Sequence, residues 1–183
     1  MIIHTPRGIQ VEEVDGTMQI IRKWYSPIYI FLMLFTLSWN AFFIYYIFIY
    51  KTQEAGESTF NIMPYVNFVI GFGLLYYNIT GLINKTTITL KHKKISVRNS
   101  PLPWPGNMEI KSEDVEQLFV KENIRRTKSS VIILFNVFII TKKNKRVKLV
   151  KNLDDKDQAL YIEAILEDKL HIQDRVIPDE VEK

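Results

Sequence analysis

The apolar residues of the chain are concentrated in two blocks that contain no charge. The first, PIYIFLMLFTLSWNAFFIYYIFIY, covers residues 27–50, and the second, MPYVNFVIGFGLLYYNITGLI, covers residues 63–83. At about 1.5 Å of rise per residue, helices of about 20 to 24 residues can cross a hydrocarbon core about 30 Å thick. Buried helices of a soluble protein are the alternative, but these seldom run so long without a charge. The pattern predicts a transmembrane hairpin over residues 26–84.

The charges that flank the two blocks predict their orientation. Arg22 and Lys23 precede the first block, Lys85 and further basic residues follow the second, and the connecting loop has only Lys51 beside two glutamates. Cytoplasmic segments carry the excess of Lys and Arg, so both termini are expected in the cytoplasm. The first block starts too far into the chain and lacks the cleavage site of a signal peptide. We therefore expect a multi-pass protein of a bacterial inner membrane.

Polar and apolar residues alternate in most of the remaining chain. IQVEEV and TMQIIRKW flank Asp15-Gly16, a pair that favours a tight hairpin turn, so residues 1–25 are expected to form a β-hairpin or an irregular arm. Strands are also predicted for TTITLK, KISVRN, MEIK, QLFVKEN, SSVIILFNVFIITKK and VKLVKNL. SEDVE predicts a brief helical turn capped by Ser112, and Ser26 is expected to cap the first long helix.

One amphipathic helix, KDQALYIEAILEDKL, follows the strands, with Asp154 or Asp155 as its cap. Glu163, Glu167 and Asp168 are expected on its surface. The segment from residue 172 to residue 183 is expected to be a flexible tail. The apolar stripe of the helix consists of Ala159, Ile162, Leu166 and Leu170, with Ile165 beside it.

Strands that precede a single amphipathic helix are the plan of a pleckstrin-homology-like (PH-like) domain. Since both flanks of the helical hairpin are expected in the cytoplasm, the N-terminal hairpin can complete the same sheet as the strands of residues 85–171. The predicted fold is a membrane α+β protein. Its two-helix transmembrane hairpin is inserted in a PH-like antiparallel β sandwich or open barrel, which a C-terminal helix caps.

The segment SPLPWPGN at residues 100–107 interrupts the strands with three prolines. Prolines hold φ near −65° and push the preceding residues into extended conformations, so Leu102 and Trp104 project from a stiff loop. One hypothesis is a structural plug, in which Trp104 packs under the sheet or against the ends of the helices. The other is a rigid ridge that binds a partner through Leu102, Trp104 and Pro105.

Charge is distributed unevenly along the chain. Residues 85–153 hold 16 Lys or Arg against 5 Asp or Glu, whereas residues 154–183 hold 4 against 10. Basic turns beside an anionic leaflet would bind its lipids, although they can equally be ordinary solvated turns. The pattern lacks the motifs of nucleic-acid-binding proteins, so no nucleic acid is expected. The candidate lipid-binding residues are Lys91, Lys93, Lys94, Arg98, Arg125, Arg126, Lys128, Lys142, Lys143, Lys145 and Arg146.

The two apolar blocks also contain asparagines and glycines, which we expect to face the partner helix or another copy of the chain. A transport path would require ionisable groups at mid-membrane, and the blocks have none. The candidate helix-packing residues are Asn40, Asn67, Gly71, Gly73 and Asn78.

Signals of an enzyme are nearly absent from the sequence. The three histidines are scattered, and no nucleophile, metal-ligand or phosphate-loop motif occurs. Without cysteine there are no disulfides, no thiol catalysis and no cysteine-bound zinc. We expect no catalytic site, no metal and no cofactor.

Five segments together resemble a family of uncharacterised bacterial membrane proteins with two helices and a PH-like cytoplasmic part. They are RKWYSPIYIFLMLFTLSWNAFF, GLLYYNITGLINKTTI, SPLPWPGN, VEQLFVKE and DQALYIEAILE, of which Pro-Trp-Pro-Gly-Asn is the most specific. Some members of that family begin with a cysteine-pair zinc knuckle, which this chain lacks. The resemblance implies the fold but no activity.

Two functions therefore remain open. The first is a protein-interaction module, as an accessory subunit of an inner-membrane assembly or through self-association. The second is a sensor of anionic membrane lipids. Salt separates them, because screening weakens the attraction of exposed charges but not a packed apolar interface.

Overall fold

The computed structural model describes residues 5–50, 62–126, 131–173, 175, 177, 180 and 181. The chain forms two compact units. The first, here called the β unit, combines residues 1–23 with residues 85–183, and the second, the helical unit, comprises residues 24–84. The β unit holds two antiparallel sheets and a C-terminal helix, so the α+β class predicted from the sequence is confirmed at this level.

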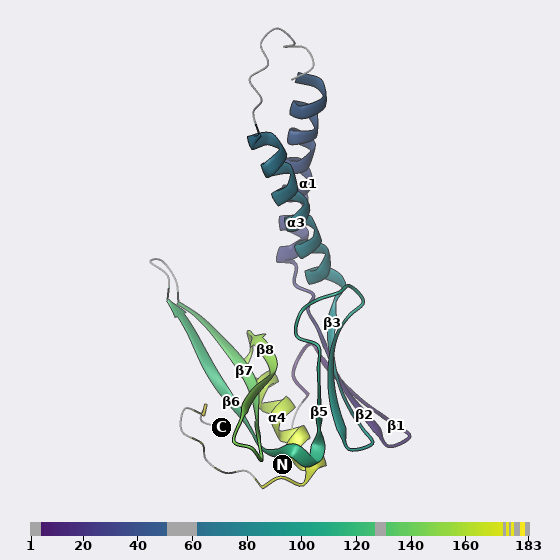
Figure 1. Ribbon diagram of the computed structural model, residues 1–183, viewed down its shortest axis with the longest axis vertical. Helices are drawn as coiled ribbons and strands as arrows, with labels where there is room; N and C mark the ends of the chain where they lie inside the picture. The colour runs from purple at the N-terminus through teal and green to yellow at the C-terminus, as the bar shows by residue number, and fades with distance from the viewer. Residues whose placement is uncertain are drawn as a thin grey trace. The chain divides into compact units, whose positions relative to one another are not determined.

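Five antiparallel strands form the first sheet, in the order β1-β2-β3-β4-β5 (Figure 1). The N-terminal hairpin belongs to this sheet, because β2 pairs with β3 from Met18 opposite Leu90 to Lys23 opposite Lys85. The sheet is therefore continuous across the point where the helical unit interrupts the chain. Its strands are β1 (Ile9–Val14), β2 (Thr17–Lys23), β3 (Lys85–Lys91), β4 (Lys94–Ser100) and β5 (Met108–Lys111).

The alternating pattern of the sequence places one face of this sheet in the core. Ile20, Ile88 and Val97 lie opposite one another on β2, β3 and β4, and each is at most 2% exposed. Asp15 and Gly16 have φ angles of 49° and 69°, as the tight turn between β1 and β2 requires. The tight turn of this hairpin, predicted from the pair Asp15-Gly16, is therefore confirmed.

Three antiparallel strands form the second sheet, in the order β6-β7-β8. The long apolar run of the sequence forms β7, in which Val137 and Ile139 are fully buried. β8 pairs with β7 only between Phe135 and Ile140, so β6 and β7 continue beyond it as a hairpin. The strands are β6 (Val115–Arg126), β7 (Val131–Thr141) and β8 (Arg146–Leu153).

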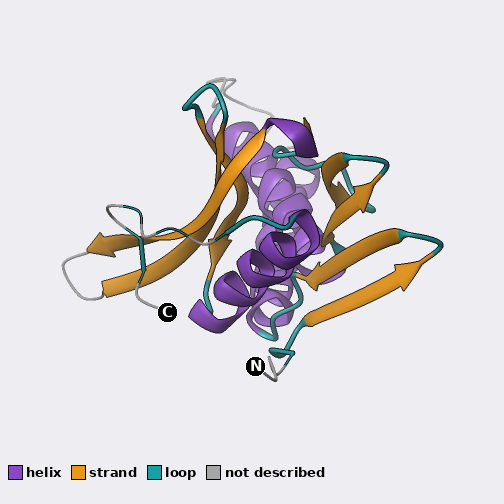
Figure 2. Ribbon diagram, turned by 90° about the horizontal axis from the view of Figure 1, so that it is seen from below, coloured by secondary structure: helices purple, strands orange, loops and turns teal. Residues whose placement is uncertain are grey.

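The C-terminal helix α4 (Lys156–Leu170) lies between the two sheets (Figure 2). Asp155 caps it, because its carboxylate accepts a 2.8 Å hydrogen bond from the N–H of Asp157. The helix ends at His171, whose backbone is left-handed with a φ of 54°. The aspartate cap predicted from the sequence is therefore confirmed as Asp155.

Because α4 lies between two sheets, it buries residues beside its apolar stripe as well as the stripe itself. Ala159, Ile162 and Leu166 are fully buried, as the apolar stripe predicted. The prediction that Glu163 and Glu167 lie on the surface is wrong, since their exposed fractions are 1% and 7%. A helix covered on two sides buries more than one stripe, so glutamates next to the stripe are enclosed as well.

Two predicted hydroxyl caps are absent. α1 begins at Ile28, Pro27 occupies the N-cap position, and no side chain caps this helix. The short 3₁₀ segment η2 (Ser112–Asp114) has Lys111 at its N-cap and likewise no side-chain cap. In each case the serine is one position away from the N-cap, so its hydroxyl cannot reach the free N–H groups.

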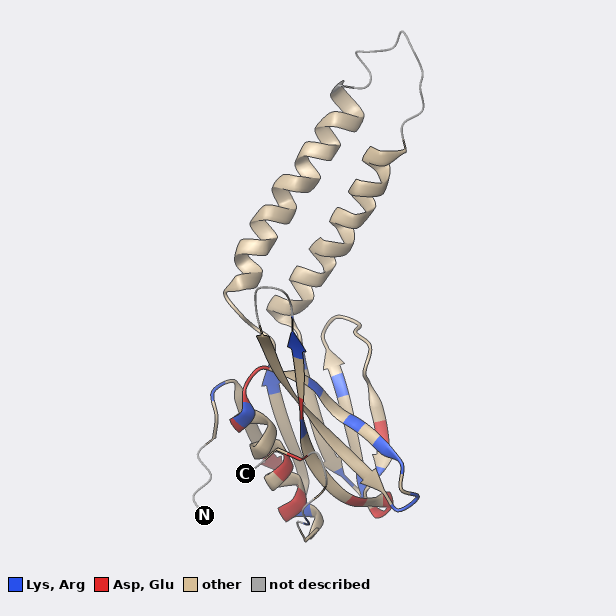
Figure 3. Cartoon of the chain, turned by 90° about the vertical axis from the view of Figure 1, so that its left-hand side faces the viewer, with Lys and Arg blue, Asp and Glu red and all other residues tan. Residues whose placement is uncertain are grey.

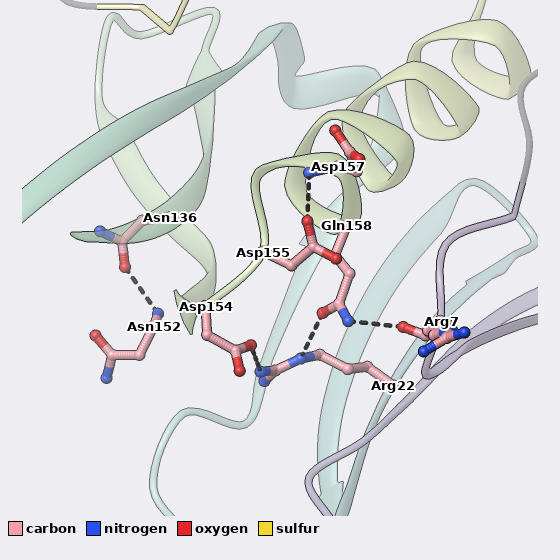
Figure 4. A network of polar contacts seen from close by, with 8 residues as sticks. All are labelled: Arg7, Arg22, Asn136, Asn152, Asp154, Asp155, Asp157 and Gln158. Carbon is pink, nitrogen blue, oxygen red and sulfur yellow. Dashed lines mark hydrogen bonds and ion pairs between the residues drawn. The ribbon is translucent and has the colours of Figure 1, made fainter. Parts of the chain in front are cut away.

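A polar network joins the N-terminal segment to α4 and the end of β8 (Figure 4). Arg22 Nε donates to Gln158 Oε1 at 3.2 Å, and Arg22 Nη2 lies 3.3 Å from Asp154 Oδ1. Gln158 Nε2 in turn donates to the carbonyl of Arg7 at 2.7 Å. These contacts fix the hairpin of β1 and β2 to residues far away in the sequence.

The described residues near the C terminus contact the second sheet, where the sequence predicted a flexible tail. The N–H of Val181 donates to the carbonyl of Val120 on the edge strand β6 at 3.0 Å. Gln117 Nε2 donates to the carbonyl of Arg175 at 3.2 Å. These contacts cover part of an otherwise open sheet edge.

The helical unit contains α1 (Ile28–Tyr45), its π-helical continuation η1 (Tyr46–Tyr50), and α3 (Met63–Ile83). The stretches Ile28–Ile49 and Met63–Ile83 are long and apolar enough to cross a membrane. The N–H of Trp24 donates to the carbonyl of Asn84 at 3.1 Å, which holds the two ends of the unit together. The predicted connecting loop covers residues 51–62, of which residues 51–61 lie outside the described residues.

Candidate functional site

The loop of residues 101–107, here called the proline loop, joins β4 to β5 and is braced by one residue of β4. The backbone N–H of Asn99 donates to Asn107 Oδ1 at 2.7 Å, and Asn99 Nδ2 donates to the carbonyl of Pro105 at 3.3 Å. Asn99 Oδ1 accepts from the hydroxyl of Thr86 on β3 at 2.9 Å. Asn99 therefore ties both the end of the loop and the neighbouring strand to β4.

The backbone conformation of the proline loop restricts which residue types can occupy its positions. The φ of Gly106 is +115°, and a Cβ there would lie 3.3 Å from the side-chain nitrogen of Asn99. Leu102 and Trp104 are partly buried, whereas Pro105 is exposed. The three candidate binding residues thus lie on one short loop whose shape is fixed by prolines and by Asn99.

Most of the predicted lipid-binding residues lie in the β3–β4 and β7–β8 turns, at one end of the β unit. The segment η2 joins these turns: the N–H of Ser112 donates to the carbonyl of Lys93 at 2.7 Å, and the carbonyl of Asp114 accepts from the N–H of Lys142 at 2.9 Å. The exposed cations of this end are Lys91, Lys93, Lys94, Lys142, Lys143, Lys145 and Arg146.

The chain connects to the helical unit at the other end of the first sheet. β2 ends at Lys23 and β3 begins at Lys85, and these two residues are paired. From Lys85 to Lys91, β3 extends by about 20 Å, at about 3.3 Å per residue. The basic turns are therefore far from the connections to α1 and α3, which weighs against their use on a membrane that these helices would cross.

The other basic candidates are separate from the two turns. Arg98 pairs with Thr87 near the Lys85 end of the first sheet. Arg125 and Arg126 are exposed at the last positions of β6. Lys128 lies outside the described residues. The predicted basic residues thus form no single patch, and Figure 3 shows Lys and Arg spread over the strands, with Asp and Glu on α4.

One cation of the β3–β4 turn is already paired. Lys94 Nζ lies 2.7 Å from Glu109 Oε1 on the neighbouring strand β5. This hydrogen bond and the charge of Lys94 lower the pKa of the Glu109 carboxyl below its usual value. The pair reduces the positive charge that this turn can offer to a lipid headgroup.

A polar cluster lies between the two helices of the helical unit. Asn78 Nδ2 in α3 donates to Thr36 Oγ1 in α1 at 2.8 Å, and Thr36 Oγ1 donates to the carbonyl of Leu32 at 2.7 Å. Asn40 Nδ2 donates to the carbonyl of Thr36 at 2.8 Å. Asn67 instead donates to a carbonyl of its own helix. Two of the three predicted asparagines therefore lie at the helix interface.

The glycines of α3 differ in what surrounds them. A Cβ on Gly71 would lie 2.6 Å from Asn40 Oδ1, and a Cβ on Gly81 would lie 2.5 Å from the ring of Tyr29. A Cβ on Gly73 would meet no atom within 4 Å. Gly71 and Gly81 thus permit close approach of the helices, whereas the predicted packing residue Gly73 does not take part in this interface.

Sequence reasoning missed Thr36 and Asn99, on which the helix cluster and the proline loop depend. Thr36 precedes Asn40 by four positions, so both lie on the same face of α1, which was an available signal. For Asn99 the only signal was its position just before the prolines. Asn99 forms hydrogen bonds with Pro105 and Asn107 at the far end of the loop, and the sequence does not show that these residues lie beside Asn99.

His, Asp and Glu side chains are scattered over the described residues. Among them, no group of three or more His, Cys, Asp or Glu side chains is placed to hold a metal ion. An open depression beside η2 is lined by Lys142, His171 and Arg175 together with Glu113 and Glu116. The depression therefore combines side chains of both charge signs on an open surface.

No protein-family model matches the chain, and no match was found among the curated proteins. The structure itself defines the class: an α+β protein with two antiparallel sheets, a C-terminal helix and two helices long enough to cross a membrane.

Proposed function

We propose that the protein is a membrane-anchored binding module without enzymatic activity. The helical unit would span a bacterial inner membrane with both termini in the cytoplasm. The β unit would act as a PH-like domain that binds a protein partner, as an accessory subunit of a membrane assembly. Two observations support the proposal: the surface of the two helices and the geometry of the proline loop.

The exposed side chains of the helices support the membrane anchor. Phe31 is 68% exposed, Val69 is 69% exposed and Phe72 is 52% exposed. Only 11% of an 18-residue stretch of the first span and 22% of such a stretch of the second are buried inside the protein, whereas the core helix of a soluble protein is mostly buried. Such surfaces are unfavourable in water, at about 25 cal/mol per Å² of apolar area, and are stable in lipid.

The braced proline loop carries the proposal of a protein partner. Its φ angles are restricted by three prolines, and Asn99 bonds to Pro105 and Asn107 before any partner arrives. A preformed loop loses little conformational entropy on binding, which favours affinity for a given contact area. Leu102 and Trp104 retain part of their surface, and aromatic side chains are enriched at the centres of interfaces.

The runner-up is a sensor of anionic lipids that uses the basic turns. The exposed lysines of the two turns favour it, but their distance from the helix connections and the Lys94–Glu109 pair weigh against it. High salt separates the functions, because the Debye length falls to about 3 Å at 1 M and a lipid contact through exposed cations is lost.

Site-specific photo-crosslinking in cells tests the proposed function. A photoreactive amino acid replaces Pro105 in one variant and Val14, which is 65% exposed on β1, in the control. We expect a defined protein adduct at Pro105 only, unchanged at high salt, and weakened when Asn107→Ala removes the 2.7 Å bond to Asn99. Equal adducts at both positions, or an adduct that Asn107→Ala leaves unchanged, would contradict the proposal.

A further inference from the structure

In the second sheet, β6 and β7 extend beyond the end of β8 as a two-stranded ribbon (Figure 1). The pairing of β8 with β7 ends where Phe135 lies opposite Leu153, whereas β6 and β7 remain paired up to Arg126 opposite Val131. Among the described residues, no third strand therefore lies beside residues 123–126 and 131–134, here called the hairpin tip.

Both faces of the hairpin tip carry exposed branched apolar side chains. Ile124 is 48% exposed and Ile133 is 44% exposed, and they lie opposite each other on the face that leads into the core. Val131 is 61% exposed on the same face, and Ile132 is 46% exposed on the other. Strands that end in water normally place polar residues at such positions, so this surface indicates a binding site.

Two exposed arginines accompany these apolar residues. Arg125 lies opposite Ile132, and Arg126 lies opposite Val131, so each face of the tip combines a guanidinium with an apolar side chain. Amphipathic helices bind the interface of anionic bilayers by combining Lys or Arg with exposed apolar side chains, and the hairpin tip offers the same combination on two strands. The charge of the tip thus matches lipid phosphates, and its apolar side chains match the boundary of the acyl chains.

The hairpin tip lies at the same end of the β unit as the connections to the helical unit. β2 ends at Lys23 and β3 begins at Lys85 at this end, and Figures 1 and 3 both show the β6–β7 hairpin pointing toward it. The basic β3–β4 and β7–β8 turns lie at the opposite ends of their strands. The hairpin tip therefore lies at the end of the β unit from which the chain continues into α1 and α3.

We propose that the hairpin tip is a membrane-binding site for anionic phospholipids. Ile124, Val131, Ile132 and Ile133 enter the interfacial region of the bilayer, and Arg125 and Arg126 bind headgroup phosphates. The proposal rests on the membrane anchor of the proposed function but not on the protein partner. It gives the β unit a second attachment besides the helices, which fixes its orientation on the membrane and thereby the direction in which the proline loop faces.

The test uses the full chain in lipid nanodiscs that contain phosphatidylcholine alone or with phosphatidylglycerol. The chain has no cysteine, so Ile132→Cys can be labelled with an environment-sensitive fluorophore at one position. The matched control is the same label at Val14→Cys, an exposed residue of β1. We expect a blue shift and quenching by headgroup-proximal nitroxide lipid at position 132 in anionic discs only, and neither at position 14. Arg125→Gln with Arg126→Gln should reduce the effect at position 132.

A label at Leu37→Cys in α1 separates failure of this inference from failure of the anchor. If position 37 is quenched by bilayer-centre nitroxides but position 132 stays solvent-exposed, the hairpin tip does not bind the membrane and the anchor stands. If neither position is quenched, the anchor fails and this inference fails with it. A blue shift at position 132 without lipid quenching would mean that a second copy of the chain covers the tip, which also overturns the proposal.

Discussion

The amide nitrogen of Asn78 in α3 donates a 2.8 Å hydrogen bond to the hydroxyl of Thr36 in α1. The two residues are 3% and 2% exposed, and the hydroxyl donates its own hydrogen to the carbonyl of Leu32. In a hydrocarbon environment no water can replace such a bond. The contact therefore couples the two helices through a buried hydrogen bond.

Thr36→Val should weaken the association of α1 with α3. Valine preserves the shape of the side chain and removes the acceptor of the Asn78 amide, so we expect a loss of about 0.6–2 kcal/mol of unfolding free energy in bicelles. The matched control is Ser38→Ala, because Ser38 is exposed and donates only to its own helix. Equal losses in the two variants would mean that the bond does not couple the helices.

Gly71→Ala and Gly73→Ala should differ although both glycines lie in the same helix. A Cβ on Gly71 would lie within 2.9 Å of three atoms of the Asn40 side chain, which the bond to the carbonyl of Thr36 holds in place. We expect Gly71→Ala to lower the unfolding free energy by about 1–3 kcal/mol, as overpacking does. Gly73→Ala should be neutral or slightly stabilising, because alanine has the higher helix propensity. The same unfolding assay compares them, and a neutral Gly71→Ala would refute the close packing.

The carboxyl of Glu109 should titrate below its usual range. The hydrogen bond and charge of Lys94 lower its pKa, so the pair stabilises the fold above the unfolded pKa, and this contribution is lost as the pH falls through the lower folded pKa. NMR titration of the Glu109 side chain measures the pKa directly. In Lys94→Met the pKa should rise toward the ordinary value, whereas Lys111→Met should leave it unchanged, since Lys111 lies beside Glu113 instead. An unshifted Glu109 in the unaltered chain would contradict the pair.

The sequence was sufficient to predict those elements whose structure depends on residues close together in the chain. The two helices, the Asp15-Gly16 turn and the Asp155 cap each depend on neighbours within a few positions. The burial of Glu163 could not be predicted in this way, because it depends on two sheets that enclose α4 from both sides.

The candidate sites show the same distinction between local and distant causes. The proline loop was visible in the sequence, but its brace by Asn99 depends on residues brought together by the fold. The sequence names the basic candidates but not their positions in space, and strand direction separates Lys91 from Arg126. The sequence predicts a strand for the whole of β7 but does not show that β8 pairs with only part of it, so the exposure of its apolar end could not be predicted.

Cysteine labelling in intact cells should establish the orientation of the helices. Basic residues precede α1 and follow α3, so these two helix ends are expected at the cytoplasmic side. The connecting loop, of which residues 51–61 lie outside the described residues, is then expected on the opposite side of the inner membrane. An impermeant thiol reagent should react with Thr52→Cys in intact cells and with Lys93→Cys, in the exposed β3–β4 turn, only after lysis.

The native chain without cysteine is the background control, and labelling of both variants after lysis shows that each cysteine is accessible. Labelling of Lys93→Cys alone in intact cells would place the β unit outside the cytoplasm. In that case the hairpin tip would face the outer leaflet of the inner membrane, and a cytoplasmic partner for the proline loop would be excluded. The proposed anchor would stand, but both proposed contacts of the β unit would have to be sought on the other side of the membrane.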